Sequence, residues 1–225
     1  MKLLAIETAT EACSVAVLVD GAIRERFEIA PRRHAELTLP WAGELLAEAG
    51  VAKSQLDAIA VGRGPGAFTG VRLAIALAQG IALALDRPLL PVSTLAALAM
   101  RADGDRILAA IDARMGEVYC GWFRAQGDGL HAIGPEWMAA PADVDVDERL
   151  LVGVGTGFAA AEGVLAENLI SKLVACDPVA LPHASDLARI AALDFAAGRA
   201  IAPDALEPAY LRDKVALTLA EQGKK

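Results

Sequence analysis

The chain of 225 residues is poor in cysteine and in aromatic side chains. It has three cysteines, Cys13, Cys120 and Cys176, far apart and without a CxxC pair, and aromatic residues make up 4% of it. This odd, scattered set excludes a disulfide framework and a cysteine-rich zinc site, and it is typical of a reducing compartment. Hydrophobic residues are nonetheless 55% of the chain. We therefore expect a globular protein whose core consists mostly of Ala, Leu, Val and Ile, with Cys13 and Cys120 inside it.

Long uncharged segments and a secretion signal are also missing. The longest uncharged run, at 73–85, has 13 residues, whereas about 20 are needed to cross a bilayer. Acidic residues at positions 7, 11 and 20 interrupt the apolar N-terminal stretch, which therefore does not resemble a signal peptide. We expect a soluble, cytoplasmic protein that does not associate with membranes.

Positive charge is scarce, and metal-ligating patterns are absent. The net charge of −8 disfavours a standing surface for nucleic acid, and we interpret the local basic segment 31–36 as solvated. His34, His131 and His183 are each isolated, without a second His or Cys at a ligating spacing, so we predict no metal site. No G-x-S-x-G nucleophile elbow is present, and we interpret Ser185 as a helix N-cap.

The first half of the chain reads as three strands followed by alternating helices and strands. We predict strands at 2–10, 13–21 and 22–30, with a hairpin closed by Asp20 and Gly21. Apolar residues at helical spacing predict a helix over 34–49, with Gly50 as its C-cap and a kink or restart at Pro40. A strand at 56–64, a helix at 69–85, a strand at 87–93 and a helix at 94–102 complete an α/β unit.

The second half repeats this order in coarse form. Two strands within 106–125 and a third short strand are followed by strand, glycine turn and helix in 149–168, a strand at 172–178 and a helix at 184–200. A coarse duplication of one α/β unit is therefore plausible. We predict an N-terminal lobe at 1–104 and a C-terminal lobe at 105–225, with a helix-prone tail from 208 that packs across the lobes.

A glycine-rich loop precedes the most apolar helix. The loop VGRGPGAFTG has no lysine where a P-loop needs one, so either it is a tight strand-to-helix turn or its backbone N–H groups bind an anion. Between positions 71 and 85 the only strongly polar side chains are Arg72 and Gln79. A helix that is apolar nearly all round needs cover on two sides. The second cover is either another helix of this chain or a partner protein.

Two stretches resemble degraded nucleotide loops of sugar kinases and actin-like ATPases. In the first, a strand-end acid and hydroxyl side chains form a turn, but a Glu stands where Asp normally holds metal and water. In the second lobe an Asp is present without its usual glycine, and a glycine turn follows a later strand. The residues concerned are Glu7, Thr8, Ser14, Asp112, Gly153, Gly155 and Gly157.

Four stretches together resemble the TsaB (YeaZ) family: ETATEACSVAV, GRGPGAFTGVRLAIALAQGIA, DARMGEVY and PAYLR. The resemblance runs from about residue 1 to 213. It implies an actin-like, RNase-H-related α/β fold of two similar lobes, each a mixed sheet with flanking helices. It also implies a non-catalytic part in the synthesis of threonylcarbamoyladenosine in bacterial tRNA. The catalytic paralogue TsaD has two metal-binding histidines where this chain has Thr94 and Leu98.

The resemblance further implies the partners. These are TsaD in a heterodimer, TsaE through the complex, a second copy when the chain is alone, and tRNA only indirectly. No cofactor of its own is expected, and a nucleotide binds only weakly or at a partner interface. We predict that the helices at 34–49 and 69–85 form the interface, with contacts at Leu37, Trp41, Leu45, Arg72, Ile75, Ala76, Gln79 and Leu83. The alternatives are an ATP-dependent kinase or acyltransferase acting alone and, with less support, a metallopeptidase.

Overall fold

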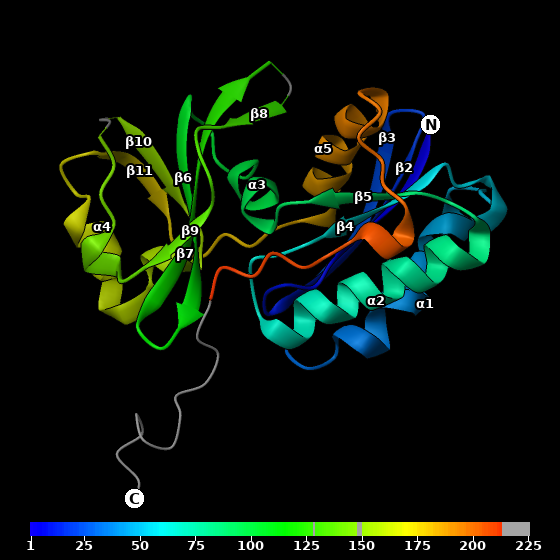
Figure 1. Ribbon diagram of the computed structural model, residues 1–225, viewed down its shortest axis with the longest axis horizontal. Helices are drawn as coiled ribbons and strands as arrows, with labels where there is room; N and C mark the ends of the chain where they lie inside the picture. Colours follow the sequence, from blue (N-terminus) through cyan, green and yellow to red (C-terminus); the bar gives the residue numbers. More distant parts are fainter. Residues whose placement is uncertain (128, 148–149, 213–225) are drawn as a thin grey trace, which may run out of the picture.

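The computed structural model describes residues 1–127, 129–147 and 150–212 and arranges them in two lobes (Figure 1). Each lobe is built on one mixed β-sheet, and helices lie between the sheets and on their outer faces. The predicted tail helix falls mostly on 213–225, outside the described residues; the part at 208–212 has no helix.

The N-lobe sheet contains β1 (Lys2–Glu7), β2 (Ala12–Val19), β3 (Ala22–Ile29), β4 (Ala58–Gly62) and β5 (Leu89–Val92). Its order is β3-β2-β1-β4-β5, with β1 antiparallel to β2 and parallel to β4. The turn between β2 and β3 has φ of 48° at Asp20 and 89° at Gly21. Two positive φ angles in a two-residue turn match the right-handed twist of a hairpin, so the hairpin prediction is confirmed.

The C-lobe sheet contains β6 (Arg106–Arg114), β7 (Glu117–Gln126), β8 (Gly129–Ala132), β10 (Leu151–Val154) and β11 (Leu173–Asp177), with β9 (Trp137–Ala139) beside β7. Its order is β11-β10-β6-β7-β8. In both lobes an antiparallel meander of three strands is therefore extended by two parallel strands next to the first one. The two lobes have one topology, as the predicted duplication requires, and the fold is actin-like.

Helices cover both faces of the N-lobe sheet. Successive side chains of a strand point to opposite faces, so Leu4 and Ile6 of β1 face α1 (His34–Glu48) and α2 (Phe68–Leu85). Leu3 and Ala5 point the other way, toward α5 (Ala184–Ala196). This alternation explains why nearly continuous apolar strands are needed here: both of their faces are buried.

The two halves of the chain exchange helices. α5 comes late in the chain but covers the N-lobe sheet, where Leu187 and Ala191 are fully buried. The assignment of all of 105–225 to the C-terminal lobe is therefore wrong for α5, because the second face of the N-lobe sheet needs an apolar cover. Conversely, α3 (Thr94–Ala99) comes from the first half and places Leu95 and Leu98 against β6. α4 (Val164–Asn168) and short turns cover the other face of the C-lobe sheet.

A glutamate on β3 holds the start of α5. The Glu25 carboxylate accepts hydrogen bonds from the Ser14 hydroxyl (2.7 Å), from a ring nitrogen of His183 (3.0 Å), and from the backbone N–H and hydroxyl of Ser185 (3.0 Å each). Burial by itself would raise the pKa of Glu25, but these donors outweigh it and lower the pKa to about 2. The predicted N-cap at Ser185 is wrong, because His183 takes the capping position and Ser185 lies in the first turn.

The predicted end of α1 is confirmed, and one of the two alternatives predicted for its middle is excluded. Gly50 has φ +65°, its N–H bonds to the Ala47 carbonyl, and the N–H of Val51 bonds to the Leu46 carbonyl. This pair of bonds is a Schellman motif, so the C-terminal glycine is confirmed. Of the two alternatives predicted at Pro40, a restart is wrong, since α1 runs through it as one helix, and a kink stays a prediction. Pro40 is exposed, so water can reach the backbone carbonyl that loses its donor.

Candidate functional site

A loop of closely packed glycines turns the chain from β4 into α2. A Cβ on three of them would collide with oxygen atoms in and after β1: Gly62 (2.1 Å from Glu7), Gly66 (2.4 Å from Ala9) and Gly70 (2.0 Å from Thr8). The glycines thus allow the loop to lie directly against the β1–β2 turn. This favours the tight-turn interpretation, and anion binding by the loop stays a prediction.

α2 has a buried face and an exposed apolar face. Ala74, Ala78 and Ala82 are fully buried against the N-lobe sheet, whereas Ala76 and Leu83 on the other side are exposed, Leu83 by 68%. Arg72 is the only charged residue of the helix. In the described part of the chain, the second apolar side of α2 therefore faces solvent.

By length and composition alone, α2 is also long and apolar enough to cross a membrane, with a mean hydropathy of 1.7 over its 18 residues. One such helix is weak evidence, because the core helix of a soluble protein passes the same test. The buried alanines of α2 belong to the N-lobe core.

The predicted interface residues are divided between core and surface. Leu37, Leu45 and Ile75 are 9%, 0% and 7% exposed and lie in the N-lobe core, so their assignment as partner contacts is wrong. α2, which holds Ile75, is apolar on nearly all sides and has no polar stripe that would mark its outward side, whereas in α1 Glu36, Glu44 and Glu48 lie on the exposed side. Ala76 and Leu83 lie on the exposed face, and Trp41 is half-buried against the core.

Three outward residues were missed. Leu39 of α1 is 49% exposed, and Gly43 of α1 and Gly80 of α2 stand next to open space, since a Cβ on either would meet nothing within 4 Å. A glycine inside a helix costs up to about 1 kcal/mol relative to alanine. No contact among the described residues requires these two glycines. A glycine in the middle of a predicted helix was therefore the feature of the sequence that could have indicated the outward face.

The other two predicted contacts bind a segment of this chain. Residues 203–212, which we call the strap, run along α2 and reach the C-terminal lobe (Figure 1). Gln79 donates from its side-chain amide to the Pro203 carbonyl (2.8 Å). Arg72 donates to the Tyr210 hydroxyl and stacks on Phe68, with 3.2 Å from guanidinium carbon to ring centroid. Arg72 and Gln79 thus hold the strap in this structure.

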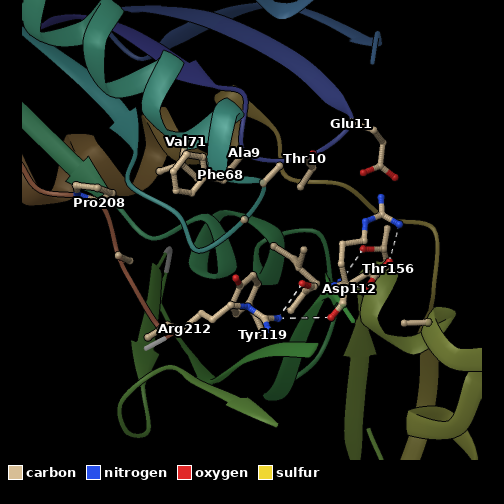
Figure 2. A pocket seen from close by; sticks show the side chains of 18 of the residues that line it. Ala9, Thr10, Glu11, Phe68, Val71, Asp112, Tyr119, Thr156, Pro208 and Arg212 are labelled. Atoms are coloured by element: carbon tan, nitrogen blue, oxygen red, sulfur yellow. Dashed lines mark hydrogen bonds and ion pairs between the residues drawn. The ribbon is translucent and has the colours of Figure 1, made fainter. Parts of the chain in front are cut away.

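A cavity of about 920 Å³ lies between the two lobes. Figure 2 shows Thr10, Glu11 and Phe68 along its N-lobe side, and Asp112 and Thr156 on the opposite side. The strap forms part of its wall. Its charged and aromatic lining residues are Glu11, Arg32, His34, Phe68, Arg72, Asp112, Arg114, Tyr119, Tyr210 and Arg212.

The strand-end acid of the first degraded loop is not among the residues that line this cavity. Glu7 is buried, and its carboxylate accepts hydrogen bonds from the Ala9 N–H (2.7 Å) and the Thr94 hydroxyl (3.0 Å). Burial raises the pKa of Glu7 to about 7, and these hydrogen bonds only partly offset the effect. Glu7 therefore bonds to Thr94, the residue that stands where the paralogue is expected to have a histidine. Thr8 lies beside it and donates to the Gly70 carbonyl (2.8 Å).

Of the other residues assigned to degraded loops, Asp112 lines the cavity and the rest do not. Asp112 is paired with Arg114 at 2.9 Å. Ser14 lies on the α5 side of the N-lobe sheet, bound to Glu25. The glycines in and after β10 support packing, since a Cβ would collide with Phe158 at Gly153 and with Ala110 at Gly155 and Gly157.

Among the described residues, no three His, Cys, Asp or Glu side chains lie close enough together to hold a metal ion. His34 contacts the Thr10 carbonyl (3.0 Å) and His183 binds Glu25. Cys13 and Cys120 are fully buried, which confirms their place in the core.

Known proteins resemble this chain over nearly its whole length. A protein-family model described as TsaD, tRNA N6-adenosine threonylcarbamoyltransferase, matches residues 27–219. The tRNA threonylcarbamoyladenosine biosynthesis protein TsaB of Escherichia coli is 43% identical over 226 residues, covering 96% of each chain. The chain belongs to the TsaB family. TsaB of Haemophilus influenzae is 36% identical over 229 residues, covering 96% of this chain and 95% of its own. The solved structure of YeaZ from Pseudomonas aeruginosa superimposes with a TM-score of 0.88 at 46% identity, over 93% of this chain and 99% of that one.

Proposed function

We propose that this chain is a non-catalytic scaffold subunit in the synthesis of tRNA threonylcarbamoyladenosine and that it binds a TsaD-type paralogue. The names of its TsaB relatives support the pathway. The observation that carries the scaffold role is the exposed apolar face of α2, where Ala76, Gly80 and Leu83 face solvent. Small residues allow a partner helix to come close, and burial of such a face contributes about 25 cal/mol per Å² of apolar area.

The degraded loops support the non-catalytic part of the proposal. Glu7, at the position expected to hold metal and water, is instead enclosed by Ala9 and Thr94. In the cavity, the Asp112 carboxylate is engaged by Arg114. We therefore expect that Asp112→Asn leaves the transfer rate of the assembled complex unchanged. A large fall in that rate, with the complex still assembled, would count against a purely structural role.

The same face serves a second copy when the chain is alone, in the cytoplasm. A TsaE-type ATPase joins through the complex, and contacts with tRNA are indirect because the chain carries a net charge of −8.

The decisive experiment places a charge on the exposed face. Ala76→Glu is expected to abolish co-elution with a purified TsaD-type partner in size-exclusion chromatography and to make the isolated chain monomeric. The matched control is Ala196→Glu at the exposed end of α5, which should leave the complex intact. Both variants should unfold at the urea concentration of the parent chain. Full complex formation by Ala76→Glu would refute the interface.

A further inference from the structure

Within the described residues, the chain passes between the two lobes three times. It leaves the N-lobe sheet after β5 to begin α3 at Thr94, and it returns between the end of β11 at Asp177 and the start of α5 at Ala184. The strap is the third crossing, from the N-lobe core at Leu206 to the C-terminal lobe at Arg212 (Figure 1). Two crossings define a hinge line, and a third crossing away from that line fixes the angle between the lobes.

The strap is the crossing that lies beside the interlobe cavity. Residues 208–212 line the cavity, whereas residues 93–99 and 178–183, at the other two crossings, do not. Beside the first crossing, the Arg63 guanidinium of the N-terminal lobe donates to the Glu136 carboxylate of the C-terminal lobe (3.2 Å), which braces the hinge itself. A rotation about the first two crossings that widens or narrows the cavity must therefore move the strap relative to one of the lobes.

The strap is bound broadly to the N-terminal lobe and narrowly to the C-terminal lobe. Leu206 is 6% exposed in the N-lobe core, and the Ala209 N–H donates to the Arg63 carbonyl (2.8 Å). Among the described residues, all hydrogen bonds and ion pairs between the strap and the C-terminal lobe come from Arg212. Its guanidinium donates to the Ala113 carbonyl (3.1 Å) and pairs with Glu117 (2.7 Å). One side chain therefore decides whether the strap is closed.

The turn that Arg212 contacts is strained. Arg114 has φ +63° and Met115 has φ +56°, and the Arg114 carbonyl accepts a weak hydrogen bond from Arg212 (3.5 Å). Left-handed conformations are unfavourable for residues other than glycine, and they persist where surrounding contacts hold them. The Arg212 side chain is 16% exposed and its partner Glu117 is 32% exposed. Loss of the Arg212 contacts thus allows the turn to relax at the same time as the strap opens.

The other end of the strap is attached to α2 next to its exposed apolar face. Arg72, Ala76 and Gln79 follow one another at spacings of four and three residues, which places them on one side of the helix. Arg72 donates to the Tyr210 hydroxyl and Gln79 to the Pro203 carbonyl. A partner helix that covers Ala76 lies within one turn of both hydrogen bonds. It shields them from water, which strengthens them.

We propose that the strap is a latch that fixes the angle between the lobes when Arg212 closes it on the 113–117 turn, and that a partner docked on α2 stabilises the closed latch. The second half of this proposal rests on the proposed scaffold function. Coupling between two sites is reciprocal, so opening of the latch weakens partner binding by the factor by which the partner favours closure.

The first test measures the distance between the lobes in the free, full-length chain by double electron–electron resonance. Cys176 is exposed on β11 and takes one spin label, and Ser54→Cys, at an exposed residue of the N-terminal lobe, takes the other. Cys13 and Cys120 are fully buried and stay unlabelled. Arg212→Ala should broaden the distance distribution and move its mean. A distribution identical to that of the parent chain overturns the latch.

A matched control removes an arginine that is paired within one layer of the N-terminal lobe. Arg199 pairs with Asp194 at the end of α5, and Arg199→Ala should keep the distance distribution of the parent chain. If Arg212→Ala does not fold, Arg212→Gln takes its place with the same expectation, because it keeps most of the side-chain packing and loses the ion pair. Circular dichroism shows whether each variant is folded.

The second test measures affinity for the TsaD-type partner. Arg212→Ala should bind at least about fivefold more weakly than the parent chain, and Arg199→Ala should bind like the parent. Equal affinities of Arg212→Ala and the parent overturn the coupling. Ala76→Glu separates the two proposals, since the free variant should keep the distances of the parent chain while losing the partner. If the parent chain itself does not bind the partner, the scaffold function and the coupling both fail, and the distance measurement still decides the latch.

Discussion

The two helical layers on the N-lobe sheet are attached by different means. On one side α1 and α2 meet the strands through apolar side chains, with Leu45, Ala74 and Ala78 fully buried. On the other side, next to α5 and the start of α3, the strands carry two hydrogen-bonded carboxylates, the half-buried Glu25 and the buried Glu7. The α1/α2 layer is therefore held mainly by burial of apolar surface. The α5 layer is held also by hydrogen bonds with fixed geometry.

This difference separates stability from recognition. The α5 side places hydrogen-bonding groups where only one arrangement satisfies them, because a buried carboxylate without donors is costly. The α1/α2 side leaves an apolar outer face exposed, with Ala76 and Leu83 in solvent. Burial of such a face by a partner is favourable, and it requires no rearrangement of the side chains packed between the helices and the sheet.

The largest contrast is expected between two neighbouring residues of α2. Ile75 is 7% exposed and Ala76 is exposed. Ile75→Glu buries a charge without a partner, and we expect a loss of about 4 kcal/mol or more, enough to unfold much of the protein. Ala76→Glu should change the free energy of unfolding by less than about 0.5 kcal/mol. Urea denaturation followed by circular dichroism measures both, and equal losses would erase the distinction between the two faces.

The next largest effect is expected at Glu25. The folded pKa of Glu25, about 2, lies below the ordinary 4.5. Its contribution to the free energy of unfolding is therefore fully present above pH 4.5 and is lost as the pH falls toward 2. Glu25→Gln should cost on the order of 3 kcal/mol at pH 7, and this difference should shrink at pH 3. Unfolding free energies at the two pH values give the result. A pH-independent difference would mean that packing, not charge, holds α5.

Glu7 should behave in the opposite way. Its pKa is raised from 4.5 to about 7, so the folded chain keeps a proton that the unfolded chain releases between these values, and stability falls as the pH rises through them. Glu7→Gln removes this penalty, and we expect a gain of up to about 3 kcal/mol at pH 8 and none at pH 4. Thermal melts across this range test the sign. A loss at pH 8 would indicate that an ionised Glu7 supports the fold.

The smallest effect is expected at Gly80, where stability and binding should separate. A Cβ there meets nothing within 4 Å, so Gly80→Ala should stabilise the chain by up to about 1 kcal/mol through helix propensity. If a partner helix lies against this position, the added methyl group should weaken the complex. Urea titration and partner affinity are measured on the same sample. Gly21→Ala is not a suitable control, because Gly21 has a positive φ and an alanine there would be strained. Gains in both would place the interface elsewhere.

Much of the fold could be predicted from local patterns. Strand alternation, the Asp20–Gly21 turn and the C-terminal Gly50 act over a few residues, and all three were predicted. The exchange of α3 and α5 between the lobes could not be, since amphipathic helices do not indicate which sheet they cover. The role of Glu25 was missed for a related reason: its donors His183 and Ser185 are 158 and 160 residues away.

The candidate interface was predicted as a pair of helices but not as a face. Apolar periodicity identified α1 and α2, yet Leu45 and Ile75 proved to be core residues. In a helix as apolar as α2, composition alone does not distinguish the side that meets the sheet from the side that meets solvent, whereas α1 carries Glu36, Glu44 and Glu48 on its exposed side. Glycines such as Gly43 and Gly80, which no internal contact explains, mark the outward side better than the leucines do.

The exchange of helices also fixes an order of events during synthesis. β5 ends at Val92, but α5, which covers the second face of its sheet, begins at Ala184. While the intervening residues leave the ribosome, Leu3 and Ala5 have no cover from α5. The nascent N-terminal lobe must therefore wait, with an apolar sheet face exposed, until almost the whole chain has been made. In this protein, two lobes of one topology are therefore not two units that can mature one after the other.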